Sequence, residues 1–323
     1  MLYLSAQPDH PYYHWQVEVM ILNFMRLGIN PNHIEAVFAY SGRVSDAGRA
    51  LANAYPFVRV FWYENTIKDS GGYPSLTRPH ILAKHWEVYP NLAQETICYH
   101  DCDIMFRALP DWRGMMNDEI CYLSDTISYI GAKYIQSKGP EILDRMAGIV
   151  GIDPKVIVDN EQNSGGAQYF IKNVDVDFWR KVEKDSKELY VYMAKREEEE
   201  RKTLSEDQLK TYNPIQKWCA DMWAVLWNLW HRGKQTRISP QMSFSWATSG
   251  AHEWDKHNIY HNAGVTEALK ATHFYKGEYI QRDPFEADLS YVKQDNCTWQ
   301  YVQSILQAKE ERKRYRSAPP PGS

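Results

Sequence analysis

The sequence lacks several features that would indicate a class of protein at once. Its five cysteines are scattered and show no zinc-like pairing. Lys and Arg number 37 against 41 Asp and Glu, so no basic excess indicates nucleic-acid binding and no acidic excess indicates disorder. No stretch approaches the ~18 consecutive apolar residues of a membrane span. The overall charge says little about partners, because a local basic groove is compatible with it.

The N-terminus, "MLYLSAQPDHPYYHW", lacks the basic and apolar regions of a secretory leader. An odd number of scattered cysteines is typical of buried thiols in a reducing compartment. From these absences we expect a soluble, cytoplasmic protein with no membrane span.

Large aromatic residues are, by contrast, abundant, with 12 Trp and 22 Tyr. Such rings either fill a core or stack on sugar and base faces at a surface. Trp223, Trp227 and Trp230 recur at helical spacing, which predicts the buried face of a helix over 216–233.

Strand and helix patterns alternate along the first part of the chain. The helix that follows the first strand is expected to stop at Gly28, and short links separate the later elements. This alternation predicts an α/β fold with an open, mostly parallel central sheet and helices on both faces. At ~150 residues per domain the length of the chain suggests two domains, but a single α/β domain can also have this length. The predicted strands are 2–6, 34–42, 58–64, 95–100, 119–125, 166–173 and 259–264.

The stretch "YHDCDIMF" places two carboxylates at the end of the fourth predicted strand. Ligands of open parallel sheets bind beyond the carboxyl ends of the strands. Residues two apart in an extended segment point the same way, so Asp101 and Asp103 can converge. A hard divalent cation would remove their repulsion, which predicts a Mg²⁺ or Mn²⁺ site. Open coordination positions on such a metal suit a diphosphate leaving group. The alternative is a surface turn in which the aspartates act as caps.

The sequence resembles the metal-dependent glycosyltransferases of the GT-A (Rossmann-like) fold, which carry a D-x-D motif at this strand end. The similar parts follow one another in order as "LYLSA", "YHDCDIMF", "NSGGAQYF", "WCADMW" and "HNAG". The resemblance implies one domain over 1–305, with a donor half over 1–174, a charged helical insertion over 175–212 and an acceptor half over 213–305. The remaining residues, 306–323, are polar and Pro-rich, and we expect a disordered tail there.

The resemblance also implies roles at the metal. Asp103 would bind the cation directly, and Asp101 would contact it through water or contact the donor sugar or ribose. Some relatives take a third ligand from a late histidine, and His261 in "IYHNAG" is preferred here over His273 in "THFYKGEY". Lys276 in "FYKGEY" would supply positive charge to the departing diphosphate. Either histidine could instead be a structural residue, and the lysine could be an ordinary surface residue.

Other site residues are implied in the same way. In "NEQNSGGAQYF", Asn163 and Gly165 would lie beside the donor sugar, unless the glycines only form a turn. Asp221 in "WCADMW" would be the general base of an inverting enzyme or would position a hydroxyl in a retaining one. Its alternative role is a helix-dipole carboxylate. Arg78 could hold phosphate or a nearby acid, and Asp125 could bond the sugar.

The expected activity is therefore transfer of a sugar from a nucleotide-sugar donor, expected to be UDP-linked, to an acceptor hydroxyl. A glycan, a peptide, a small molecule and a modified DNA base all remain open as acceptors. One alternative is a metal-dependent nucleotidyltransferase, although "SAQPDHPYY" lacks the glycine- and lysine-rich phosphate loop usual there. The other is a non-catalytic sugar-binding module that relies on its aromatic residues.

Overall fold

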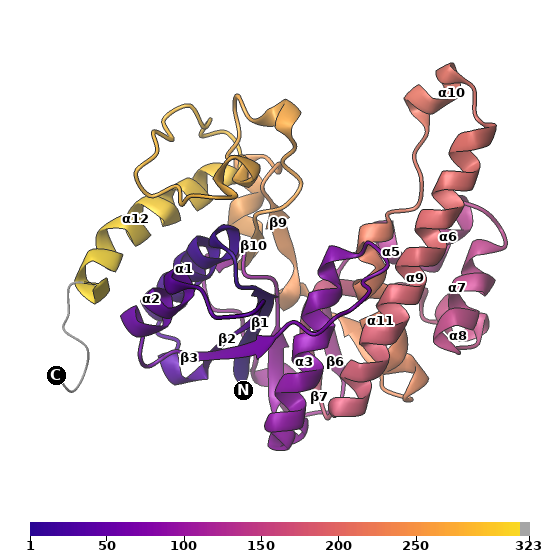
Figure 1. The fold of residues 1–323 in the computed structure, drawn as a ribbon, viewed down its shortest axis with the longest axis horizontal. Coiled ribbons are helices and arrows are strands. Elements are labelled where there is room, and N and C mark those ends of the chain that lie inside the picture. The colour runs from indigo at the N-terminus through magenta and orange to yellow at the C-terminus, as the bar shows by residue number, and fades with distance from the viewer. Residues whose placement is uncertain (317–323) are drawn as a thin grey trace. The chain divides into compact units, whose positions relative to one another are not determined.

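The computed structural model describes residues 1–316, which fold into two compact units (Figure 1). Unit 1 consists of residues 1–64, 97–116 and the chain from 240 onward. Unit 2 consists of residues 65–96 and 117–239. The chain therefore leaves unit 1 and returns to it twice.

Unit 1 is built on parallel strands in the order β3-β2-β1-β4. Nearly every residue of β1 and β2 is buried, which is the pattern of strands covered on both faces rather than on one. The α/β class predicted from the alternating pattern is confirmed. The strands are β1 (Leu2–Pro8), β2 (Ile34–Tyr40), β3 (Arg59–Glu64) and β4 (Thr96–Tyr99).

Local sequence signals set the ends of the first helices of unit 1. Helix α1 (Pro11–Arg26) starts with proline at its first position, where no backbone donor is needed. It stops because Gly28 adopts a left-handed φ of 85°, as predicted. In α2 (Asp46–Ala54) the Ser45 hydroxyl accepts the Gly48 N–H at 2.9 Å and caps the helix. Figure 1 shows α1 and α2 over the strands of this unit.

A smaller, three-stranded sheet completes unit 1 and carries its site residues. Its strands are β5 (Ile104–Phe106), β10 (Ile259–His261) and β9 (Phe244–Trp246), in that order. β10 runs antiparallel to β5 and parallel to β9. This pairing brings a late part of the chain against the residues that follow β4. A short helix, α4 (Arg113–Met116), lies between these strands in the sequence.

Unit 2 has strands in the order β7-β6-β8, with β7 antiparallel to β6 and β8 parallel to it. The register of β6 against β7 shifts between Leu123 and Ser124, and Ala167 adopts an unusual φ of 64° beside this bulge. The strands are β6 (Cys121–Asp125), β7 (Gly165–Lys172) and β8 (Thr236–Ile238). Its shorter helices are α5 (Ile127–Ile130), α6 (Ala132–Ser137), α7 (Ile142–Val150), α8 (Pro154–Asp159) and α10 (Glu206–Thr211).

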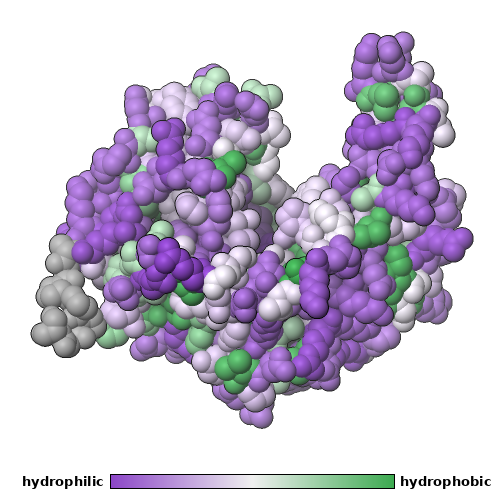
Figure 2. Space-filling model, viewed as in Figure 1, coloured by the Kyte–Doolittle hydropathy of each residue, from purple (hydrophilic) through white to green (hydrophobic). Residues whose placement is uncertain are grey.

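Three longer helices pack side by side in unit 2: α3 (Thr77–Val88), α9 (Val176–Thr203) and α11 (Ala220–His231). The predicted tryptophan stripe of α11 is buried. The first half of α9 is core as well, since Trp179, Val182 and Leu189 are buried. The far end of α9 and α10 is mainly hydrophilic (Figure 2). The expected insertion over 175–212 thus divides into a packed half and a solvated half.

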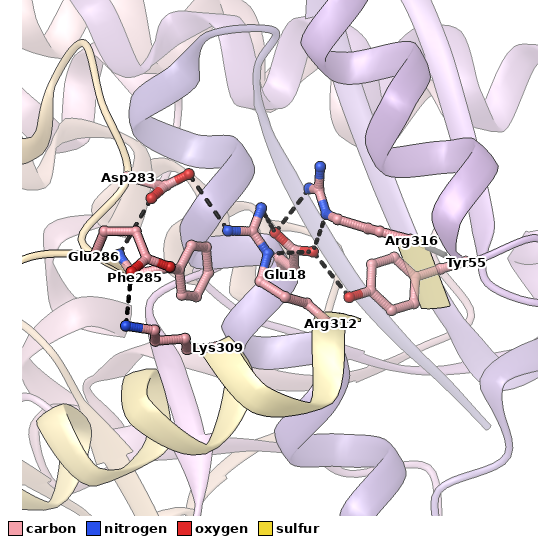
Figure 3. Close-up of polar contacts among 8 residues, drawn as sticks. All are labelled: Glu18, Tyr55, Asp283, Phe285, Glu286, Lys309, Arg312 and Arg316. Carbon is pink, nitrogen blue, oxygen red and sulfur yellow. Dashed lines mark hydrogen bonds and ion pairs between the residues drawn. The ribbon is translucent and has the colours of Figure 1, made fainter. Parts of the chain in front are cut away.

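The prediction of a disordered tail is wrong for residues 306–316, because they form the end of helix α12 (Thr298–Arg316). Figure 3 shows the reason: Arg312 and Arg316 converge on Glu18 of α1. Glu18 is 1% exposed, and it also accepts the Tyr55 hydroxyl at 2.9 Å. A buried carboxylate needs such partners, so the charged end of α12 is ordered by pairing rather than solvated. The rest of the expected tail, 317–323, lies outside the described residues.

All five cysteines are buried, as predicted, and none forms a disulfide within the described residues. Within residues 1–316, no helix combines the length and the apolar character that crossing a membrane requires.

The pairing in Figure 3 predicts a stability effect. Glu18→Ala should lower the free energy of unfolding by about 3 kcal/mol, because it removes the buried carboxylate that pairs with Arg316 and leaves Arg312 with the more exposed Asp283 at 3.5 Å. Glu310→Ala, which removes an exposed partner of Lys313 on the same helix, should change it by less than about 0.5 kcal/mol. Denaturant unfolding monitored by circular dichroism measures both. Equal stability of the two variants would contradict the role given to Glu18.

Candidate metal centre and carboxylate cluster

The D-x-D motif forms the turn between β4 and β5, at the carboxyl end of β4. The His100 N–H donates to the Leu4 carbonyl at 3.0 Å and so extends the β1 ladder past the end of the strand. Burial lowers the pKa of His100 to about 4, so its neutral ring can donate to the Asp101 carbonyl at 2.9 Å. The Asp103 carbonyl accepts the Asn262 N–H at 2.9 Å. The turn is thereby fixed at both ends.

Asp101, Asp103 and His261 converge on one point. Each offers a ligand atom, and these atoms lie within 4.8 Å of one another. The His261 Nε2 is 3.4 Å from Asp101 Oδ2 and 3.2 Å from Asp103 Oδ1. Asp103 and His261 are buried, whereas the Asp101 side chain retains 28% exposure. The cluster is therefore open to ligands on the side of Asp101.

The position of His261 depends on the smaller sheet. His261 pairs with Ile104 of β5 and with Trp246 of β9. The Trp246 ring stacks on the imidazole with 5.8 Å between centroids and an interplanar angle of 18°. The ring is thus held on one face while Nε2 points to the two aspartates. His273 is not part of this cluster within residues 1–316, and its Nδ1 lies 2.9 Å from the Thr272 hydroxyl.

Lys276 contributes a positive charge to the same cluster. It begins the 3₁₀ turn Lys276–Tyr279, and its ammonium pairs with Asp103 Oδ2. Burial alone would raise the pKa of Asp103, but the charges of Lys276 and His261 outweigh it and hold that pKa well below the ordinary value. Burial would lower the pKa of Lys276, yet the Asp103 carboxylate raises it. Both groups are therefore ionised at neutral pH.

The donor set of this cluster fits a divalent cation. Two carboxylates and one imidazole are ligands that Mn²⁺ accepts, and carboxylate oxygens also suit Mg²⁺. The partly exposed Asp101 leaves coordination positions that protein atoms do not fill. The Lys276 ammonium competes with a metal for Asp103, because both are cations drawn to one carboxylate. The arrangement can therefore exchange one cation for another.

A second carboxylate cluster lies in unit 2, around Asp221. This residue stands in the first turn of α11, where the helix dipole favours negative charge. Arg78 Nη2 lies 2.6 Å from its Oδ2, and the Tyr73 hydroxyl donates to its Oδ1 at 2.7 Å. Burial and the neighbouring Asp221 charge raise the pKa of Tyr73 well above its ordinary value, so the phenol stays protonated. Both carboxylate oxygens are thus engaged, and the side chain is held in one orientation.

The remaining predicted site residues also lie in unit 2. Asp125 pairs with Gly165 across β6 and β7, and its Oδ1 accepts the Ile127 N–H at 3.1 Å, which caps α5. A Cβ at Gly165 would meet Leu123, Ser124 and Ile238 atoms at 2.5 Å, so packing alone requires glycine there.

Asn163 lines a polar cavity of about 450 Å³ together with Lys234 and Arg237. The proposed donor contacts of Asn163, Gly165 and Asp125 stay predictions.

Three contributing residues were not found from the sequence. Tyr73 holds Asp221, and Trp246 supports His261. Tyr12 of α1 hydrogen-bonds Lys276, and burial raises the pKa of this tyrosine. All three are aromatic residues in a chain rich in them, so composition could not separate them from ordinary core residues. The sequence contains a signal for Tyr12 alone: it lies in "PDHPYY" at the end of β1, and the ends of parallel strands line ligand sites.

No protein-family model matches the chain, and neither does any curated protein sequence. Among solved structures, it is similar to the apo WbbM bifunctional glycosyltransferase, with a TM-score of 0.50 and 10% identity over 98% of this chain and 52% of that one. The chain thus spans about half of the length of WbbM. Mouse xyloside xylosyltransferase 1 is also similar, with a TM-score of 0.40 and 10% identity over 82% of this chain and 99% of that one. The structural neighbours are glycosyltransferases, and the likeness to WbbM supports a GT-A-like fold.

The first cluster predicts metal binding that depends on Asp103. Saturating Mn²⁺ should raise the thermal midpoint of the wild type, because a ligand at about 100 times its dissociation constant adds roughly 2.7 kcal/mol. Asp103→Asn should lose most of this shift, whereas Asp111→Asn, a control at an exposed aspartate of the same unit, should keep it. An unchanged shift in Asp103→Asn would exclude the cluster as the site.

The competition between Lys276 and a metal predicts a gain of affinity. Lys276→Met should bind Mn²⁺ roughly threefold more tightly or better, because the ammonium no longer neutralises Asp103. Electron paramagnetic resonance of free Mn²⁺ during a titration measures this. Weaker binding would instead mean that the lysine holds Asp103 in place for the metal.

Proposed function

We propose that this chain is a glycosyltransferase that moves a sugar from a nucleotide-sugar donor, UDP-linked, to an acceptor hydroxyl with Mn²⁺ or Mg²⁺. One observation carries the proposal: Asp101, Asp103 and His261 converge, beside Lys276, at the carboxyl end of β4 in a GT-A-like fold. That edge is where open parallel sheets bind ligands. A site with two carboxylates, an imidazole and an ammonium is suited to a cation and a diphosphate.

In this proposal, Asp101, Asp103 and His261 hold the divalent metal. When bound, the metal neutralises the charge that develops on the departing diphosphate. Asp103 is the direct ligand, fixed by the turn between β4 and β5. Asp101, which is more exposed, contacts the metal through water or contacts the donor sugar or ribose.

Lys276 has two positions in this proposal. Without metal it neutralises Asp103, as its ion pair indicates. With metal and donor it turns to the diphosphate, where a preorganised positive charge lowers the energy of charge separation. Tyr12 provides a hydrogen-bond partner that limits where the ammonium goes.

The residues of unit 2 are assigned to the sugars. We assign Asn163, Gly165 and Asp125 to the donor sugar. Asp221 accepts a hydrogen bond from the acceptor hydroxyl, acting as base in an inverting reaction or as a positioning group in a retaining one. Arg78 holds this carboxylate in one orientation. The Tyr73 hydroxyl fixes the other oxygen.

The donor is tested with a panel of UDP- and GDP-sugars and Mn²⁺, measured by thermal shift and by nucleotide release. One donor should raise the thermal midpoint and release nucleotide, and both effects should need the metal. Asp103→Ala should abolish release while the circular dichroism spectrum stays unchanged. Binding of sugars without metal, and no release from any donor, would favour a sugar-binding module instead.

Asp221→Asn separates transfer from donor binding. It keeps the shape of the side chain but removes its negative charge, so the transfer rate should fall by roughly 10²-fold or more while the dissociation constant of the donor changes little. Steady-state kinetics and calorimetry measure the two quantities. Glu183→Gln, at a partly exposed glutamate of the same unit, is the control. A near-normal transfer rate for Asp221→Asn would exclude both roles.

A further inference from the structure

One large aromatic side chain is exposed beside the Asp221 cluster. Of the 12 tryptophans, only Trp218 belongs to the exposed class in the described residues, with 54% relative exposure. Its ring stacks with Tyr129 at 6.0 Å between centroids and an interplanar angle of 30°. A single exposed apolar side chain is ordinary at a protein surface, but a stacked pair of rings also presents an apolar face on which a ligand can pack.

The ring pair is held by rigid backbone on both sides. Trp218 lies in the 3₁₀ turn Lys217–Cys219, and its carbonyl accepts the Tyr73 hydroxyl at 3.1 Å. The next residue, Cys219, is fully buried. Tyr129 lies in α5, whose start is capped by Asp125. A ligand that stacks here would lose little affinity to the ordering of the protein, because the rings are already placed.

The pair is also linked to the predicted catalytic carboxylate. The Tyr73 hydroxyl contacts both the Trp218 carbonyl and Asp221 Oδ1. Trp218 precedes Asp221 by one helical turn, and residues with this spacing lie on the same side. A ring stacked on Trp218 would therefore lie close to the first turn of α11, which carries Asp221.

The charges around the pair select the kind of ligand. Asp221 is paired with Arg78, and Lys217 is paired with Glu197, each at 2.6 Å. The exposed Asp125 and Lys133 each stand four residues from Tyr129, and their charges are opposite. These charges balance, so the surroundings of the pair offer no positive excess to hold the phosphate groups of a nucleic acid. A neutral sugar ring suits the site, since its C–H face packs on an aromatic ring while its hydroxyls donate to carboxylate oxygens.

We propose that Trp218 and Tyr129 form a stacking platform for a neutral pyranose ring of the acceptor, so that the acceptor is a glycan. That the bound sugar is an acceptor rests on the proposed function. Binding of a sugar by the platform does not depend on transfer. Trp218 supplies the larger exposed face. Tyr129 supports it from behind, and Asp221 receives a hydroxyl of the same saccharide.

Direct binding tests the platform independently of catalysis. Saturation-transfer NMR is recorded on the full chain with methyl β-glucoside, β-galactoside, α-mannoside and β-xyloside, without donor or metal. One pyranoside should receive saturation on the C–H face of its ring. Trp218→Ala should remove the effect, Trp218→Phe should keep part of it, and Phe57→Ala, at an exposed ring of unit 1, should keep all of it.

Kinetics then connects the platform to the acceptor. With the donor found above, Trp218→Ala should raise the KM for a glycan that ends in the selected sugar by about fivefold or more, and Trp218→Phe should restore most of the loss. The KM for the donor should not change. If no transfer is found with any donor but NMR binding persists, the proposed function fails while the platform stands.

Two results would overturn the inference. One is equal saturation transfer in the wild type and Trp218→Ala, or none to any pyranoside. The other is a dimer in light scattering that Trp218→Ala converts to monomer, which would assign the exposed ring to self-association.

Discussion

The neutralisation of one buried carboxylate, Asp103, is the constraint on which the candidate site depends. A charge removed from water must be paired, and here Lys276 and His261 contact it, while Asp101 places a second carboxylate beside them. The two partners come from different elements: the end of β10 and the 3₁₀ turn at Lys276. The pairing of β10 with β5 in the smaller sheet brings His261 next to the turn that carries Asp103. A divalent cation would meet the same requirement more strongly than the lysine does.

The two carboxylate clusters are neutralised in different ways, and the difference suits different tasks. Asp103 is paired with a lysine, a compact charge on a flexible stem that can exchange for a metal. Asp221 is paired with an arginine and a protonated tyrosine, which fix both of its oxygens. The first arrangement permits replacement of one cation by another. The second maintains an oriented acceptor for a hydroxyl group.

Much of the fold could be predicted because its signals are local. The strands β1 to β4, β6 and β7 follow the predicted runs of apolar residues, whereas the three-residue strand β5 was not predicted. Gly28 and Ser45 mark helix ends through their own backbone and side-chain chemistry. The error at residues 306–316 arose because charge composition was interpreted as solvation. Arg312 and Arg316 are ordered by Glu18, which lies far away in the sequence and is buried for reasons that no local pattern reveals.

By itself, the sequence determined that two aspartates stand at the end of a buried strand, since apolar runs and period-two spacing are properties of adjacent residues. It favoured His261 over His273 but did not exclude His273. Only the tertiary structure decided which histidine lies beside the two aspartates, because the pairing of β10 with β5 brings His261 to them. The contacts of Tyr73 with Asp221 and with the Trp218 carbonyl were likewise decided in three dimensions. A hydrogen bond between distant segments depends on packing, which leaves no mark on the residues beside either partner.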